Sequence, residues 1–196
     1  MSNPWDRPAL PNRGDRDNAR TYEGVGRVID GWESVEFEMS RLYSVMAGHP
    51  DDAGLLQRYG SGRIFRDRQA KLQEMADRYF ILQPNQRFES TFDLLDAHAN
   101  GFSERRNDVA HGIVFDVKTL EFFTNRFPPN LRNKTVYLLI PPLHTIRHHG
   151  ADGFPVYAYN YALLMHLAIA LEQLKHLFRD FKRALPSVEG PLAVPL

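Results

Sequence analysis

The sequence contains no cysteine, which excludes disulfide bonds and the zinc or iron–sulfur sites that are built from thiolates. It also has no excess of charge of one sign, because 24 Lys and Arg residues balance 24 Asp and Glu residues. A balanced charge argues against sequence-independent coating of DNA but allows a local basic cleft for one RNA segment. No apolar run reaches membrane-spanning length, and the first residues lack the apolar core of a signal peptide. We therefore expect a cytoplasmic protein that does not act at a membrane.

The chain has 196 residues, of which 43% are hydrophobic, and this is enough for one domain with a well-formed core. Residues 1–21 are rich in Arg, Asp, Asn and Pro and show no period, which predicts a disordered tail or an arm that orders on a partner. Residues 186–196 contain three prolines and a glycine and cannot continue a helix, which predicts a second tail. The folded domain is expected over residues 22–185.

Apolar residues at helical spacing predict four long helices. The first is expected over about 23–46 and the second over about 63–82, separated by a glycine-rich loop at 48–62. Asn85 is a plausible N-cap for the third helix, which is expected to end near His111 and Gly112. The fourth is expected over about 160–185.

Between the third and fourth helices the period changes. Residues 113–117 and 135–140 form short β-type runs, and residues 154–157 form a weaker one. Proline pairs and glycines separate these runs. The predicted fold class is therefore all-α: an up-down bundle of four long helices, with a small β-type insertion at about 113–157.

The third helix carries one charged residue on its apolar face. The face consists of Phe88, Phe92, Leu95, Ala99, Phe102 and Val109, with Arg106 at the missing step. A guanidinium there is costly unless it is paired or faces a wet cleft. His111 follows five residues later, and Gly112 can end the helix. An arginine and an imidazole near a helix end indicate a site for a phosphate and a proton.

Such a pair suits the cleavage of an RNA phosphodiester. Histidine can donate or accept the protons, and arginine grips phosphate through parallel hydrogen bonds, so that no metal or cofactor is required. On an ideal helix, however, Arg106 and His111 lie about 140° apart and about 7.5 Å apart along the axis. They converge only if the helix unwinds at Gly112 or if a second subunit supplies the complement. We therefore expect a homodimer.

The segment Arg106-Asn107-x-x-x-His111 resembles the R-x4–6-H motif of HEPN domains, and the predicted four-helix context is similar to theirs. The resemblance covers about residues 22–185 in architecture and residues 104–112 in sequence. It implies a metal-independent endoribonuclease, often a toxin or phage-defence effector, that acts as a dimer. It also implies that Arg106 and His111 are catalytic, with Asn107 in support. Arg105 fits the looser spacing and is a candidate substrate contact.

Each of these residues also has a structural interpretation. Arg106 could form a buried ion pair with Glu36 or Glu38, and His111 could cap the helix. Arg68, on the apolar face of the second helix, is either a structural arginine or a grip for RNA phosphate at the rim of a cleft. The alternative functions are accordingly a non-catalytic module that binds a partner protein, an antitoxin or a nucleotide, and a structural dimer with Arg106 ion-paired.

Three histidines in the insertion raise the question of a metal site. His144 and His148 have helical spacing, and His149 follows directly. A proline pair precedes them, a glycine follows, and no carboxylate lies within the run, so a solvated basic loop that touches RNA is the better interpretation. We predict no metal site, and we predict RNA and a second copy of the chain as partners.

Overall fold

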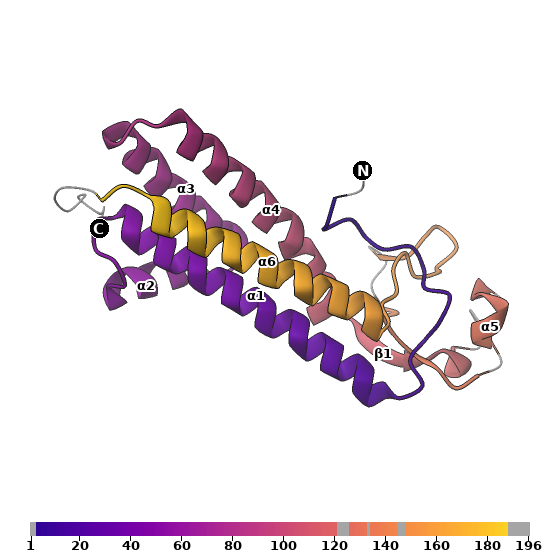
Figure 1. Cartoon of the computed structure of the whole chain (residues 1–196). Coiled ribbons are helices and arrows are strands. Elements are labelled where there is room, and N and C mark those ends of the chain that lie inside the picture. Colours follow the sequence, from indigo (N-terminus) through magenta and orange to yellow (C-terminus); the bar gives the residue numbers. More distant parts are fainter. Residues whose placement is uncertain (1–2, 121–125, 133, 145–147, 188–196) are drawn as a thin grey trace. The chain divides into compact units, whose positions relative to one another are not determined.

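A computed structural model of the chain describes residues 3–120, 126–132, 134–144 and 148–187. It divides into two compact units. The hairpin unit comprises Met1–Trp32 and Gly101–Leu171, and the bundle unit comprises Glu33–Asn100 and Glu172–Leu196. Three long helices contribute residues to both units, namely α1 (Asn18–Met46), α4 (Gln86–Ala110) and α6 (Tyr161–Ala184) (Figure 1).

The predicted all-α class with a small β insertion is confirmed. The fourth long helix is α3 (Phe65–Leu82), and the four together match the expected order and extents within a few residues. Asn85 caps α4 as predicted, because its side-chain oxygen accepts from the backbone N–H groups of Arg87 and Phe88. Within the described residues, no helix combines the length and the apolar character needed to cross a bilayer.

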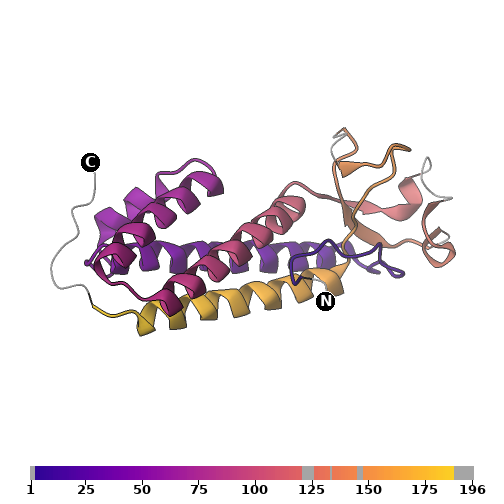
Figure 2. The same ribbon diagram turned by 90° about the horizontal axis from the view of Figure 1, so that it is seen from above.

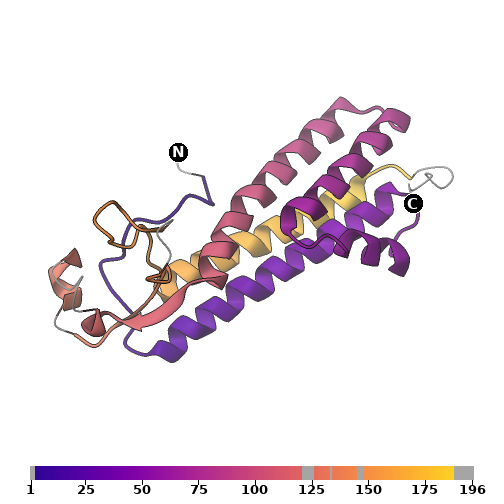
Figure 3. The ribbon, with the colours of Figure 1, turned by 180° about the vertical axis from the view of Figure 1, so that it is seen from behind.

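The glycine-rich stretch predicted as a loop contains a short helix. This helix, α2 (Ala53–Gly60), lies in the bundle unit between the end of α1 and the start of α3 (Figure 3). Asp52 caps it by accepting from the N–H of Leu55, and it buries Leu55 and Tyr59. The prediction of a continuous loop over 48–62 is therefore wrong, because one good N-cap and two buried apolar residues outweigh the glycines at both ends.

The bundle unit buries most of each predicted helix face. Phe181 of α6 packs against both Phe88 and Phe92 of α4. Leu82, expected in the core, is 53% exposed because it lies in the last turn of its helix. The buried Glu38 carboxylate accepts from Lys182 at 2.7 Å and from Arg179 at 3.2 Å. The charge that α1 buries is thus compensated by α6.

The hairpin unit contains the two strands. β1 (Ile113–Asp116) and β2 (Tyr137–Ile140) pair antiparallel, with Ile113 opposite Ile140 and Asp116 opposite Tyr137. Residues 154–157, expected as a weaker third strand, contribute only an isolated bridge at Pro155. A short 3-10 turn, η1 (Val117–Thr119), follows β1, and α5 (Pro129–Arg132) precedes β2.

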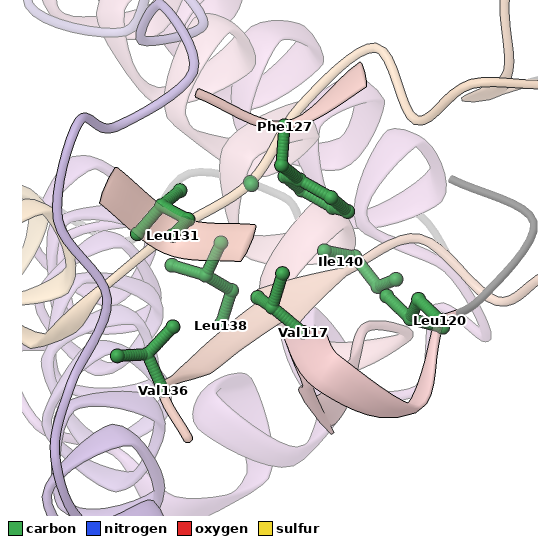
Figure 4. Close-up of a cluster of buried hydrophobic side chains, with 8 residues drawn as sticks. Val117, Leu120, Phe127, Leu131, Val136, Leu138 and Ile140 are labelled. Atoms are coloured by element: carbon green, nitrogen blue, oxygen red, sulfur yellow. The ribbon is translucent and has the colours of Figure 1, made fainter. Parts of the chain in front are cut away.

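A second hydrophobic core covers one face of this hairpin (Figure 4). It is built from residues of β2 and from the segments that flank the two strands, and it is local to the hairpin unit. Its buried members are Val117, Leu120, Phe127, Leu131, Val136, Leu138, Ile140 and Ala158. The insertion therefore has a hydrophobic core of its own.

Residues 3–17, which we call the arm, contact the rest of the hairpin unit. The backbone of Asp15 exchanges hydrogen bonds of 3.0 and 2.8 Å with Tyr137, the first residue of β2. Its carboxylate accepts from the N–H of Tyr161, the first residue of α6, and from the hydroxyl of Thr21. The expectation of a disordered tail thus does not hold for residues 3–21, of which 18–21 belong to α1. In the other predicted tail, residues 188–196 lie outside the described residues.

In the hairpin unit, α1 and α6 lie side by side at very short range (Figures 1 and 2). A Cβ atom built on Gly24 would lie 2.8 Å from the Cβ of Leu164, and one built on Gly31 would lie 3.3 Å from the Cβ of Leu171. Glycine at these two positions is therefore what allows the helices to approach. Gly26, two residues after Gly24 and therefore on the other side of α1, has no atom within 4 Å of such a Cβ.

We expect Gly24→Ala to destabilise the protein and Gly26→Ala to stabilise it. Alanine favours the helix by about 1 kcal/mol at both sites. At Gly24 this gain is outweighed by overpacking against Leu164, which costs about 1–3 kcal/mol. Urea denaturation of both variants measures the difference in the free energy of unfolding. Equal effects of the two substitutions would contradict the close approach of α1 and α6.

Candidate functional site

The motif occupies the last two turns of α4, in the hairpin unit. At about 100° per residue, Arg105 and Arg106 flank the apolar face on opposite sides of Phe102. The structure buries Arg105 more deeply, with 6% of its side chain exposed, whereas Arg106 is half-buried. The sequence pattern placed the buried arginine at position 106. It could not distinguish the two, because both lie within one residue of the missing step.

Arg105 belongs to an ionic cluster around the carboxylate of Asp108. One Arg105 nitrogen, Nη1, lies 2.8 Å from Asp108 Oδ2. Arg7 of the arm donates to the same carboxylate from Nε and Nη2, each at 2.9 Å, in bidentate geometry. Only 2% of the Asp108 side chain is exposed. A carboxylate buried to this extent is stable only because two guanidinium groups neutralise it.

Two tyrosines complete the cluster. The Tyr157 hydroxyl donates to the backbone carbonyl of Asp108 at 3.1 Å, and the Arg7 guanidinium lies 5.5 Å from the centre of the Tyr157 ring. Burial raises the pKa of Tyr159 to about 12, and the Asp108 charge acts in the same direction while Arg105 opposes it. Both phenols therefore stay protonated at neutral pH, and Tyr157 serves as a donor that caps a carbonyl in the last turn of α4.

The arm is also held by apolar packing on α4. Trp5 meets the Phe102 ring edge-on, with 5.7 Å between the ring centres. A Cβ atom on Gly101 would lie 2.5 Å from the indole of Trp5, so glycine is required there. Trp5 contacts the turn of α4 that precedes the motif, and Arg7 binds Asp108 within the motif. The conformation of that helix end thus depends on residues about a hundred positions away in the chain.

Of the predicted catalytic residues, Asn107 and His111 are exposed and Arg106 is half-buried. The Arg106 guanidinium lies 5.5 Å from the centre of the Trp32 ring, on α1. The N–H of His111 donates to the carbonyl of Asn107 at 3.1 Å, so helical geometry continues through His111. The helix does not unwind before Gly112. Arg106 and His111 of one chain therefore remain on different sides of α4, as the ideal geometry predicts.

The two predicted substrate contacts are engaged elsewhere. Arg105 is buried in the Asp108 cluster. Arg68, 15% exposed, donates from Nε to Glu36 at 2.6 Å and from Nη1 to the carbonyl of Gly62 at 2.9 Å. Both guanidinium groups are therefore used in ion pairs within the fold, and a contact of either one with RNA stays a prediction. Their positions on apolar helix faces are explained by ion pairing within the fold.

The histidines of the insertion do not gather around a common point. His144 is exposed, and the His148 ring packs edge-on against Tyr157, with 5.7 Å between ring centres. Among the described residues, no group of three or more His, Asp or Glu side chains is arranged to hold a metal ion. His148 thus contributes to the packing that orients Tyr157 toward α4.

Sequence reasoning missed Asp108, Arg7 and Tyr157, which position the motif. Asp108 carries one local signal, because it follows Arg105 at the i, i+3 spacing of helical ion pairs. Arg7 carries none, since it lies 101 residues from its partner in a segment of disordered composition. Tyr157 lies in a loop whose path is set by the β hairpin.

We expect Asp108→Asn to lower the free energy of unfolding by about 3–5 kcal/mol, because it removes the buried carboxylate shared by Arg7 and Arg105 and leaves Arg105 only the exposed Glu104 as a countercharge. Arg7→Gln should cost less, because 37% of the Arg7 side chain is exposed. Urea denaturation gives these values, and trypsin cleavage at Arg13 and Arg16 reports release of the arm. The matched control is Asp93→Asn, an exposed residue of the same helix. Equal effects at positions 93 and 108 would contradict the cluster.

The chain was compared with known proteins at three levels. Models of protein families, curated protein sequences and solved structures all give no match. The resemblance to HEPN domains consequently depends on the motif residues and their helical context alone, and the assignment of a function depends on the chemistry of the end of α4.

Proposed function

We propose that this protein is a metal-independent endoribonuclease of the HEPN type, in which Arg106 and His111 act on an RNA phosphodiester. The observation that supports it is that the polar residues at the end of α4 fall into a buried group and an exposed group. Arg105 and Asp108 are buried in ion pairs that fix the helix end, whereas Asn107 and His111, between and beyond them, are exposed. Polar residues that the fold does not bury are the ones available for chemistry.

Each motif residue has a definite task in this proposal. His111 transfers a proton to or from the reacting oxygens, since an imidazole can both donate and accept a proton. Arg106 carries the positive charge that stabilises the phosphorane-like transition state, and the Trp32 ring limits where its guanidinium can lie. Asn107 orients one of these groups or the phosphate.

The helical geometry favours a second copy of the chain. Because helical hydrogen bonding continues to the N–H of His111, the side chains of Arg106 and His111 of one chain leave α4 in different directions. Two copies related by a two-fold axis, with their motif helices facing each other, would combine the arginine of one with the histidine of the other. The homodimer is therefore part of the proposed mechanism.

The HEPN domains that the motif resembles are often toxins or phage-defence effectors. The proposal therefore extends to a role as a toxin or phage-defence effector, with an antitoxin or other protein partner that covers the end of α4. A module that only binds such a partner or a nucleotide is the competing function, and the experiments below separate the two.

We expect the wild-type protein to cut a labelled mixed RNA in the presence of EDTA. His111→Ala should reduce the rate by about 100-fold or more, the usual contribution of a general acid or base. His98→Ala, on the same helix, is the matched control and should retain activity. Gel analysis of the products, with melting curves for each variant, makes the measurement. Cutting by His111→Ala at the wild-type rate would refute the site, and no cutting by any protein would favour the binding module.

Mixing two inactive variants tests the composite dimer. Arg106→Gln and His111→Ala should each be inactive alone. After unfolding and refolding together in equal amounts they should recover roughly a quarter of wild-type activity, because half of the dimers are mixed and each has one intact site of two. Light scattering checks the dimer. An active wild type whose mixed variants recover nothing would show that both residues act within one chain.

A further inference from the structure

A hollow of about 770 Å³ lies in the hairpin unit, between the arm and the segment that leads into β2. From the arm it is lined by residues 12–14 and Arg16, and from the other side by residues around α5 and the start of β2. Its size falls within the range of small-molecule and nucleotide sites, about 300–1,000 Å³. The motif at the end of α4 makes no use of it.

The charged side chains that line the hollow are all basic. They are Arg13, Arg16 and Lys134, and each is exposed. Within the part of the chain that the structure describes, no carboxylate lines the hollow or forms an ion pair with any of the three. This contrasts with Arg7 and Arg105, whose charges are satisfied by Asp108. Three cations gathered around one concavity create a local positive potential in a chain with zero net charge.

The neighbouring acidic residue does not neutralise this group. Asp15 stands between Arg13 and Arg16 in the sequence, but its carboxylate accepts from the Tyr161 N–H and the Thr21 hydroxyl. Those two bonds tie it to the starts of α6 and α1. Asp15 thus holds the arm in place, whereas Arg13 and Arg16 line the hollow.

The hollow is held in shape by the contacts of the arm backbone. The side chains of Asn130 and Asn160 donate to the carbonyls of Asn12 and Arg13 respectively. A Cβ atom on Gly14 would lie 2.8 Å from the Cβ of Val136, the residue before β2. Glycine at position 14 therefore allows the arm to pass this close to the start of the strand. The basic side chains therefore extend from a fixed backbone, which reduces the entropy lost when they bind a ligand.

The buried cluster of the hairpin unit lies behind the hollow. Leu131 and Val136 line the hollow and belong to this cluster, so they fix the wall from which the basic side chains extend (Figure 4). Exposed cations around a hollow of this size match the phosphate of a nucleotide, which needs positive charge. Arginine is well suited to this task, because its planar fork matches two oxygens of a phosphate.

The β hairpin relates the hollow to the motif. The hollow lies at the Asp116–Tyr137 end of the strand pair, where Asp15 bonds to Tyr137. The motif lies at the other end, because β1 begins two residues after His111. Three residue steps of β1, roughly 10 Å, separate the two ends. A single strand of RNA is a ligand that can extend over both.

We propose that this hollow binds the phosphate backbone of single-stranded RNA and holds it beside the motif. The inference deepens the proposed endoribonuclease function and rests on it for the identity of the ligand. Arg13, Arg16 and Lys134 make the phosphate contacts.

The salt dependence of RNA binding tests the proposal. All proteins carry His111→Ala to keep the RNA intact, and fluorescence anisotropy gives the affinity for a labelled single-stranded RNA between 50 and 200 mM salt. Adding Arg13→Gln and Lys134→Gln should lower the slope of log affinity against log salt by roughly 1.4, because each lost phosphate contact removes about 0.7. The matched control removes two exposed charges of the bundle unit, with Arg66→Gln and Arg87→Gln, and should leave the slope unchanged.

Several outcomes overturn the proposal. They are an unchanged slope in the hollow variant, equal losses in the hollow variant and the control, and absence of RNA binding by the His111→Ala protein. Complete displacement of RNA by millimolar inorganic phosphate at constant ionic strength would show a site for a lone phosphate instead. If the hollow variant melts abnormally, the pair Arg16→Gln and Lys134→Gln replaces it.

Cleavage assays with His111 intact separate this inference from the proposed function. The hollow variant should cut RNA with a raised KM and an unchanged kcat. If the wild type cuts nothing but RNA binding still depends on the hollow, the endoribonuclease proposal fails and the binding site stands. If the wild type cuts RNA and the hollow variant has the wild-type KM, the binding site fails and the endoribonuclease stands.

Discussion

The hairpin unit depends on one buried carboxylate. Asp108 sits on α4 with 2% of its side chain exposed, and such a charge is tolerated only with close countercharges. Arg105 supplies one from the same helix, and Arg7 supplies the other from the arm. The requirement to neutralise Asp108 therefore ties the N-terminal residues to the end of α4. Tyr157, which donates to the Asp108 carbonyl, brings the loop before α6 to the same place.

The parts of this fold that could be predicted are those with local causes. The four long helices follow from apolar spacing, the two strands from β-branched runs, and the start of α4 from the cap at Asn85. The helix α2 was not predicted because the glycines around it indicate a loop. Its only helical signals are the N-cap at Asp52 and two apolar residues that face the core. The order of the arm could not be predicted, since its partners Phe102, Asp108 and Tyr137 are distant in sequence.

The candidate site divides in the same way. Its position at the end of α4 is a local property, and the structure agrees with it. Which of two adjacent arginines is buried is not local, because positions 105 and 106 are almost equally placed about the apolar face. Arg7 of the arm binds the same carboxylate as Arg105, whereas the Arg106 guanidinium contacts the Trp32 ring of α1. Helix periodicity can locate such a pair, but the neighbouring elements assign the roles.

The zero net charge of the chain constrains how it can recognise an anion such as RNA. Long-range attraction is weak when opposite charges are mixed, and salt screens what remains of it beyond about 10 Å. Affinity must then come from a few short-range contacts, so the distribution of paired and unpaired cations matters more than their number. Here the arginines of the helix faces are used for ion pairs within the fold, as for Arg68 and Arg105. The basic residues around the hollow lie on the arm and beside β2, outside the helical core, where binding an anion need not break an ion pair on which folding depends.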